Sequence, residues 1–277
     1  MYRRYPKPVR LSSPILIMLL LVTGGCSLLP EQIDKTKEWP ASKLYSEAKE
    51  SLDDQNYEQA IDYFEKLEAR FPFGRYAQQA QLEIAYAYYK YDEPESAIAA
   101  ADRFIKENPR HPNVDYAWYL KGLVNYNRGA TFLDRWLPQD TSERDLSSMR
   151  DAYEDFYHLA RYYPDSIYTA DAAQRVIHLR NKMARYEIHV ADYYLRRGAY
   201  IATTNRSQYV VENFQRTPAV SDALILMVRA YRKLEMNELA DDALRVLRTN
   251  YPLDPSLEAL EQGRDPEQKS GWFSWFR

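Results

Sequence analysis

The chain has 277 residues, of which 45% are hydrophobic and 28% are charged, and its formal net charge is −3. That length suits one solenoid or two small domains, and the low glycine count, 8, together with helical periodicity throughout, favours an all-α chain. Without the basic leader, residues 1–25, the chain keeps 33 basic and 40 acidic residues, which argues against a nucleic acid partner because phosphate binding needs a basic face.

The first 25 residues have the pattern of a secretory signal peptide. The leader is basic up to Arg10 and contains no acidic residue, and Ile15 to Val22 is an apolar run of eight. A run of that length is too short to span a bilayer. We therefore expect a signal peptide over residues 1–25 and not an anchor helix.

The leader ends in Thr23-Gly24-Gly25-Cys26, and Cys26 is the only cysteine. This arrangement resembles the lipobox of bacterial lipoproteins, although Thr23 stands where that family prefers leucine. The resemblance implies cleavage before Cys26 and acylation of its thiol and new amino group. Ser27, in place of aspartate, implies export to the outer membrane, and residues 26–40 are then a lipidated tether. The alternative is an ordinary signal peptide with an incidental cysteine.

A recurring unit begins after residue 40. Ala48 and Ala60 are small residues twelve positions apart, one on each of two predicted helices, where packed helices come closest. The polar residues 53–56 separate the two helices. Pro72, twelve positions after Ala60, ends the second helix.

The same positions recur four more times along the chain. They are Ala85, Ala97 and Pro109; Gly122, Ala152 and Pro164; Ala191, Thr203 and Gln215; and Val228, Ala240 and Pro252. This pattern resembles the tetratricopeptide repeat. Since such repeats bury their apolar faces only by stacking, the resemblance implies a superhelical solenoid of about five helix pairs with a concave groove.

We divide this solenoid into residues 41–164, which hold repeats 1–3, and residues 165–256, which hold a long linking helix and repeats 4–5. A polar and aromatic tail follows over residues 257–277. The stretch 166–197 contains no proline or glycine and is either one helix or two helices with a break near Asn181. His178 and His189 on it are too far apart to bind one metal ion.

In the tetratricopeptide family the first helix of each pair lines the groove. Transferring that register to this sequence gives a mostly aromatic candidate set for binding an extended peptide. The set is Tyr45, Lys49, Leu82, Tyr86, Tyr89, Tyr116, Tyr119 and Tyr126. The alternative for each tyrosine is packing between helices.

Three further features carry functional hypotheses. The third copy has an insertion over residues 129–146, which either covers the groove mouth or meets a partner, or folds back onto its own repeat. Arg206 interrupts a small and apolar run and either pairs with an acidic neighbour or contacts another protein. The aromatic end of the tail, Trp272 to Phe276, is suited to docking on the solenoid, on a partner or at the membrane interface.

The sequence contains no glycine-rich phosphate loop, no Gly-x-Ser-x-Gly, no His-Glu-x-x-His and no paired cysteines, so we expect no enzyme and no cofactor. A lipobox followed by five such repeats resembles the BamD lipoproteins of the β-barrel assembly machinery. The segments that carry this resemblance are Phe71-Pro72-Phe73-Gly74, residues 85–90, residues 102–105 and His111-Pro112-Asn113.

The BamD resemblance implies a lipid-anchored scaffold on the inner leaflet of the outer membrane of a Gram-negative bacterium, facing the periplasm. The amino-terminal repeats would bind the carboxy-terminal signals of unfolded outer-membrane proteins. The carboxy-terminal repeats would hold the POTRA region of BamA, alongside the other lipoproteins of the complex. Two alternatives are a repeat lipoprotein that binds cell-wall-associated partners and a periplasmic sugar-cleaving enzyme.

Overall fold

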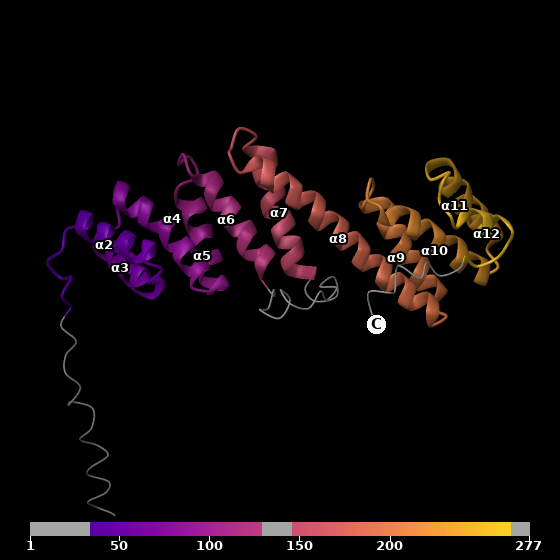
Figure 1. The fold of residues 1–277 in the computed structure, drawn as a ribbon, viewed down its shortest axis with the longest axis horizontal. Helices are drawn as coiled ribbons and strands as arrows, with labels where there is room; N and C mark the ends of the chain where they lie inside the picture. Colours follow the sequence, from indigo (N-terminus) through magenta and orange to yellow (C-terminus); the bar gives the residue numbers. More distant parts are fainter. Residues whose placement is uncertain (1–33, 129–145, 267–277) are drawn as a thin grey trace, which may run out of the picture. The chain divides into compact units, whose positions relative to one another are not determined.

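The computed structural model describes residues 34–128 and 146–266, in which the helices α2 to α12 follow one another in chain order (Figure 1). Their bounds are α2 Ala41–Asp53, α3 Tyr57–Arg70, α4 Arg75–Lys90, α5 Pro94–Glu107, α6 Val114–Asn127, α7 Leu146–Tyr162, α8 Thr169–Arg196, α9 Tyr200–Asn213, α10 Ala219–Lys233, α11 Asn237–Asn250 and α12 Leu257–Glu261. The chain divides into two units, Met1–Pro40 and Ala41–Arg277. The predicted signal peptide, Cys26, almost all of the 129–146 insertion and the aromatic end of the tail lie outside the described residues.

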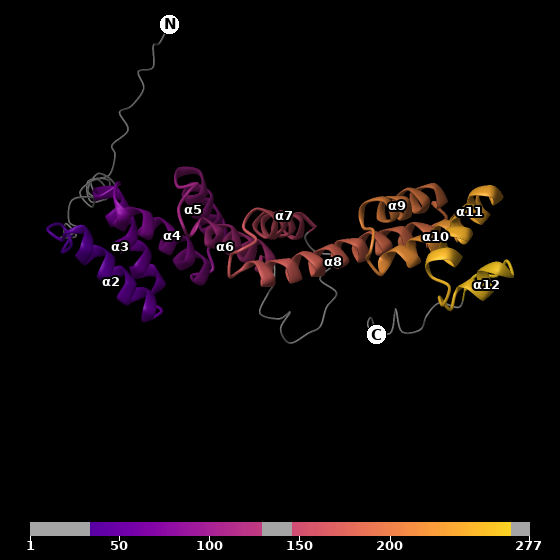
Figure 2. The ribbon, with the colours of Figure 1, turned by 90° about the horizontal axis from the view of Figure 1, so that it is seen from above.

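The described part of the second unit contains five consecutive helix pairs followed by the short helix α12, so the predicted all-α repeat architecture is confirmed. Every regular element within residues 34–128 and 146–266 is a helix, and each helix packs against the next one in the chain (Figure 2). The first helices of neighbouring pairs also meet, since α2 contacts α4, α4 contacts α6 and α8 contacts α10. Side chains on α2, α4 and α6 can therefore form one continuous face, and those on α8 and α10 can form another.

The small positions that define the repeat are buried, as predicted. At ten positions, two per copy, the side chain or glycine lies in the interior: Ala48, Ala60, Ala85, Ala97, Gly122, Ala152, Ala191, Thr203, Val228 and Ala240. In the third copy the first small position is a glycine that lies directly against an aromatic ring. A Cβ atom on Gly122 would lie 2.7 Å from Cε1 of Phe156, a contact too short for any residue but glycine.

All five second helices end two residues before the last position of the repeat pattern. These last positions are Pro72, Pro109, Pro164, Gln215 and Pro252. In the first copy, α3 ends at Arg70, and the N–H of Phe71 donates to the carbonyl of Leu67 at 2.8 Å. A following proline disfavours helical backbone at the residue before it, which explains this end. Phe214 ends the fourth copy in the same way, with a bond to Val210 at 2.9 Å, although Gln215 replaces the proline. The fold therefore sets this end without requiring proline.

The turn inside four of the five pairs contains a residue in the left-handed backbone region. The residues are Gln55, Asp92, Gly198 and Glu235, with φ of 63°, 63°, 76° and 59°. Only the fourth copy uses glycine, the residue that adopts this conformation without a steric cost. The shared turn geometry, together with the spacing of these residues, marks the repeat independently of the apolar pattern.

The stretch that we left as one helix or two is a single helix, α8, of 28 residues. Its first part, up to Met183, packs in a core cluster with Phe156 of α7. From Ala184 onward its buried residues join a different cluster, shared with α9 and α10. One helix thus contributes to the cores of two successive pairs.

Ordered structure continues beyond the predicted start of the tail. Residues 257–261 form α12, and the side chains of Leu257 and Leu260 are buried against α10 and α11. The last pair is therefore closed by a short helix that covers its end. Among the described residues, no helix has the length and apolarity needed to cross a bilayer.

Candidate functional site

The predicted peptide-binding residues lie on the first helices α2, α4 and α6 of the amino-terminal pairs. Seven of the eight are partly exposed. Leu82 is only 8% exposed and packs in a core cluster with Phe104. It supports this face from beneath, and we do not include it among the contacting residues.

The face begins between α2 and α4. The rings of Tyr45 and Tyr76 lie 5.5 Å apart, and Nζ of Lys49 donates to Oε1 of Glu83 at 3.1 Å. Burial alone would lower the pKa of Lys49, but the hydrogen bond and attraction to Glu83 outweigh it and raise that pKa. Burial and the charge of Glu83 raise the pKa of Tyr45. The lysine therefore stays charged and the tyrosine stays a neutral hydroxyl.

The face continues between α4 and α6. The rings of Tyr86 and Tyr89 are 6.5 Å apart, and Nδ2 of Asn127 donates to the hydroxyl of Tyr89 at 2.7 Å. Tyr116 lies beside them, and burial, followed by the charge of Glu83, raises the pKa of its hydroxyl. These rings are thus held in place by hydrogen bonds and by one another.

The rings of this face come closest together where α6 approaches the start of α8. Tyr168, immediately before α8, stacks on Tyr119 with ring centroids 4.7 Å apart and an interplanar angle of 18°. It also contacts Tyr116, with centroids 5.5 Å apart. The hydroxyl of Tyr119 donates to Oδ2 of Asp171 at 2.8 Å. The three rings form one rigid cluster.

A guanidinium group borders this cluster. Nε of Arg175 donates to Oδ2 of Asp171 at 2.5 Å, and the guanidinium carbon lies 4.8 Å from the ring centroid of Tyr126. Burial alone would raise the pKa of Asp171, but hydrogen bonds from Arg175 and Tyr119 hold it below its usual value. Tyrosine rings, hydroxyls, one carboxylate and one guanidinium therefore lie side by side, a combination suited to binding an extended peptide.

We call this surface the tyrosine face, and the sequence reasoning missed part of it. It consists of the predicted Tyr45, Lys49, Tyr86, Tyr89, Tyr116, Tyr119 and Tyr126, together with Tyr76, Glu83, Tyr168, Asp171 and Arg175. Tyr168 and Asp171 belong to the stretch that the repeat register left unassigned. The spacing of Asp171 and Arg175, four residues apart on a helix, was a usable signal for an ion pair.

A partly buried polar cluster surrounds Lys121 and Asn125 in the carboxy-terminal part of α6. Nζ of Lys121 is 2.9 Å from Oδ1 of Asp102 and 3.3 Å from Oδ1 of Asp155, and Nδ2 of Asn125 donates to Oδ2 of Asp155 at 2.9 Å. Burial raises the pKa of Asp155 to about 6, against the attraction of Lys121 and the hydrogen bond from Asn125. Burial would lower the pKa of Lys121, but its two carboxylate partners outweigh burial and raise it. This cluster ties α5, α6 and α7 together.

Arg206, the predicted partner contact, lies on α9 and pairs with an acidic neighbour. Its Nη1 is 3.0 Å from Oε2 of Glu187 on α8, whose side chain is 6% exposed, whereas that of Arg206 is 46% exposed. The arginine neutralises a buried carboxylate and still reaches the solvent. Whether it also contacts a partner stays a prediction.

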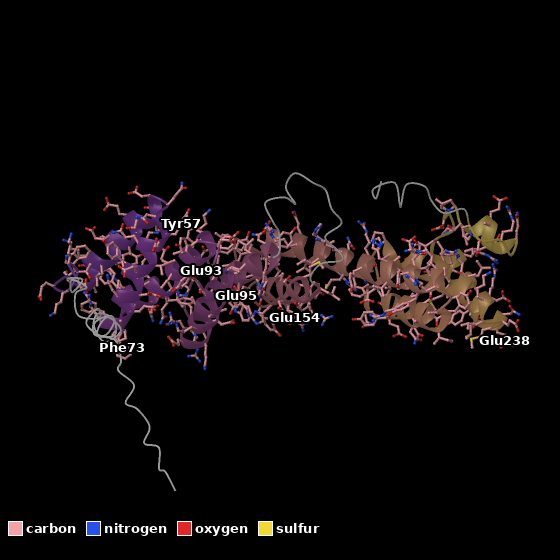
Figure 3. The ribbon with its side chains drawn as sticks, turned by 90° about the horizontal axis from the view of Figure 1, so that it is seen from below. Tyr57, Phe73, Glu93, Glu95, Glu154 and Glu238 are labelled. Carbon is pink, nitrogen blue, oxygen red and sulfur yellow. The ribbon has the colours of Figure 1, made fainter. Side chains whose placement is uncertain are left out.

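Glu187 also lines a pocket of about 210 Å³ between α7, α8 and α9. Glu154, labelled in Figure 3, is one of its lining residues and belongs to α7. The other lining residues are Leu146, Arg150, Tyr153, Arg180, Met183, Tyr209, Asn213 and Phe214. Arg206 therefore stands next to a concave surface with both aromatic and charged walls.

No three histidine, cysteine, aspartate or glutamate side chains within residues 34–128 and 146–266 converge as ligands for a metal ion.

Residues 37–247 match the YfiO family, described as outer membrane lipoproteins. Similar proteins include the outer membrane protein assembly factor BamD of Neisseria meningitidis serogroup B, which is 46% identical over 223 residues that cover 80% of this chain and 84% of the relative. The chain belongs to the BamD family of outer membrane lipoproteins. The predicted family resemblance is confirmed.

Other members of the BamD family match over most of their length at lower identity. BamD of Xylella fastidiosa (strain Temecula1) is 37% identical over 94% of this chain and 88% of its own length. BamD of Vibrio cholerae is 34% identical over 84% of this chain and 96% of its own length. The matched residues of the family, 37–247, include the whole tyrosine face and Arg206, whereas Cys26 precedes them.

Proposed function

We propose that this chain is a non-enzymatic scaffold that assists the assembly of β-barrel proteins into the outer membrane. The names of its relatives, outer membrane protein assembly factors, support this role, and so does an architecture of stacked helix pairs with an extended aromatic surface. Membership of an outer membrane lipoprotein family supports its location at that membrane. None of the described contacts favours the cell-wall alternative over this one.

The tyrosine face is the proposed binding site for the carboxy-terminal signals of unfolded outer-membrane proteins. The observation that carries this proposal is the cluster of Tyr116, Tyr119 and Tyr168 beside Arg175. A signal that ends in an aromatic residue offers a ring for the tyrosines and a terminal carboxylate for the guanidinium. An extended strand presents alternate side chains to such a surface.

We expect Tyr119→Ala to weaken binding of such a signal about tenfold, which corresponds to about 1.4 kcal/mol. The substitution removes the ring that stacks on Tyr168 and the hydroxyl that orients Asp171. The measurement is a fluorescence titration of the full chain with a peptide copied from the carboxy terminus of a β-barrel protein.

The matched control is Tyr162→Ala, because Tyr162 is 62% exposed on α7 and lies outside the tyrosine face. The control should bind the peptide as the unsubstituted chain does. Equal binding by both variants, or crosslinks from the peptide that avoid Tyr86, Tyr89 and Tyr119, would count against this site.

The carboxy-terminal pairs are the proposed contact for the POTRA region of BamA, with Arg206 as one contacting residue. We expect Arg206→Ala to reduce co-purification with BamA and to lower the free energy of unfolding by about 1–2 kcal/mol. The second effect follows because Glu187 loses its cation, and it is moderate because solvent screens the half-exposed arginine.

Two further variants separate the structural effect of Arg206 from the partner contact. Glu187→Gln keeps Arg206 and removes the buried charge, so it should retain BamA. Arg185→Ala, an exposed arginine on α8, is the matched control and should change neither property. Full retention of BamA by the Arg206→Ala variant would remove the proposed contact.

Cys26 is the proposed attachment point for the lipid, on the inner leaflet with the helix pairs in the periplasm. The lipobox-like residues before it support this proposal. Three acyl chains would hold the protein far more firmly than one, since each buried methylene adds about 0.8 kcal/mol. Mass spectrometry of the mature amino-terminal peptide tests it, and an unacylated peptide that begins elsewhere would refute it.

A further inference from the structure

A second concave site in the amino-terminal pairs lies on the opposite side of α4 from the tyrosine face. A pocket of about 610 Å³ lies between α3, α4 and α5. Its lining residues are Glu65, Glu68, Ala69, Ile84, Tyr88, Ser96, Ala99, Ala100 and Arg103. Ile84 and Tyr88 are one turn apart on α4, and Tyr86 between them points to the opposite side of the helix. The pocket is thus separate from the proposed signal-binding site.

The floor of this pocket is apolar and its wall is acidic. Ala69, Ile84 and Ala100 supply apolar surface. The acidic wall carries Glu65 and Glu68, and Glu93, labelled at the start of α5 in Figure 3, adds its charge near Tyr88. A liquid water occupies about 30 Å³, so the volume is sufficient for an entire long side chain.

The internal contacts of this pocket leave one carboxylate oxygen without a donor. Nη2 of Arg103 donates to Oε2 of Glu68 at 2.7 Å, and the hydroxyl of Tyr88 donates to Oε1 of Glu65 at 2.6 Å. The second oxygen of Glu68, Oε1, is buried and has no hydrogen-bond partner in the described part of the chain. A buried acceptor in this state is costly, and a donor from outside would relieve the cost.

Charge determines what kind of donor fits. Arg103 is the one cation among the lining residues, against the carboxylates of Glu65 and Glu68. Burial, together with the charges of Glu107 and Glu65, raises the pKa of Glu68, and Arg103 opposes this shift only in part. The pocket therefore attracts a further positive charge and repels an anionic group.

We infer that this pocket binds a basic side chain, lysine or arginine, of a partner polypeptide. The cationic group would donate to Oε1 of Glu68 close to Glu65, and the aliphatic stem would lie along Ala69, Ile84 and Ala100. Lysine and arginine combine these two properties, a long apolar stem and a charged end. The site goes beyond the proposed signal recognition and involves none of the tyrosine face.

The test is a titration of the isotopically labelled full chain with short peptides. Binding is monitored through the NMR chemical shifts of Ala69, Ile84 and Ala100. The probes are capped pentapeptides of glycine, leucine, a central residue, leucine and glycine, with lysine, arginine or glutamine in the centre. We expect the lysine and arginine peptides to bind at least about tenfold more tightly than the glutamine peptide. Glu68→Gln should reduce their binding to the level of the glutamine peptide.

Two other variants keep the test decisive if Glu68→Gln perturbs the fold. Ala99→Trp replaces an exposed alanine of the pocket wall and should abolish binding by filling the space, with Glu68 intact. Glu58→Gln removes an exposed carboxylate from the first turn of α3, outside the pocket, and should bind as the unsubstituted chain does.

Several results would overturn the inference. One is that the glutamine peptide binds as tightly as the lysine and arginine peptides, and another is that the Ala99→Trp variant still binds these basic peptides tightly. A third is that the unsubstituted chain self-associates and the Ala99→Trp variant does not, which would assign the pocket to a second copy of the chain. Signal binding at the tyrosine face is measured with a different peptide and should persist in Ala99→Trp. Failure of either proposal is thus distinguishable from failure of the other.

Discussion

Replacing Phe156 by alanine is expected to lower the free energy of unfolding by about 3–5 kcal/mol, the largest single-residue effect that we predict. The side chain of Phe156 is fully buried between α6, α7 and α8. Its ring lies against Gly122 and has its centroid 5.9 Å from that of Tyr119 and 6.4 Å from that of Tyr126. Truncation leaves a cavity that the glycine cannot fill. Urea denaturation followed by circular dichroism measures the loss.

The control for this prediction is the neighbouring Tyr157→Ala, because Tyr157 is 43% exposed. It should change stability by less than about 0.5 kcal/mol. Gly122→Ala should cost about 1–3 kcal/mol in the unsubstituted chain, since the new methyl group would meet the Phe156 ring, and less in the Phe156→Ala background. Additive effects of the two substitutions would contradict the proposed contact.

The free energy of unfolding is expected to fall by about 3 kcal/mol between about pH 4 and pH 7, because the buried Asp155 keeps its proton to a higher pH in the folded chain than in an unfolded one. Its pKa is about 6 in the folded chain, raised by burial, and about 3.9 in an unfolded one. Between these values the folded chain holds a proton that the unfolded chain has released. Stability therefore decreases as the pH rises through this window and becomes level above it.

The Asp155→Asn variant isolates this contribution from those of other titrating groups. Asparagine cannot ionise, and Lys121 keeps its bond to Asp102 at 2.9 Å. We therefore compare the free energy of unfolding of the variant with that of the unsubstituted chain at each pH. This difference should shift in favour of the variant by about 3 kcal/mol between about pH 4 and pH 7. Asp151→Asn, at an exposed position one turn earlier on α7, should show no such change. A difference for Asp155→Asn that stays constant with pH would refute the prediction.

The repeat pattern was sufficient to predict the fold because its signals are local. The small buried positions and the ends of the second helices depend on neighbouring residues at fixed spacing. The end at Phe214 followed from register alone, since Gln215 lacks the steric effect of proline. The continuity of α8 could not be decided, because a tight break and an uninterrupted helix have the same apolar period. What decides between them is the packing of the two parts of α8 in two different core clusters.

The candidate site could be predicted only in part, because its contacts join helices distant in sequence. The register placed all six predicted tyrosines on one face, but it also assigned Leu82 to that face although its side chain is buried. It could not identify Tyr168 as the ring that stacks on Tyr119, because the residues lie on different helix pairs. The pairing of Arg206 with Glu187 was one of two alternatives that the sequence left open.

The unbroken α8 joins the amino-terminal helix pairs to the carboxy-terminal ones, because its two parts pack in successive cores. A helix of 28 residues is about 42 Å long at about 1.5 Å per residue, and each residue turns the chain by about 100°. Inserting or deleting a single residue near Asn181 would thus shift one half only slightly but would rotate it by more than a quarter of a revolution. We therefore expect the rotation about α8, far more than the change in length, to disturb the relative orientation of the amino-terminal and carboxy-terminal helix pairs.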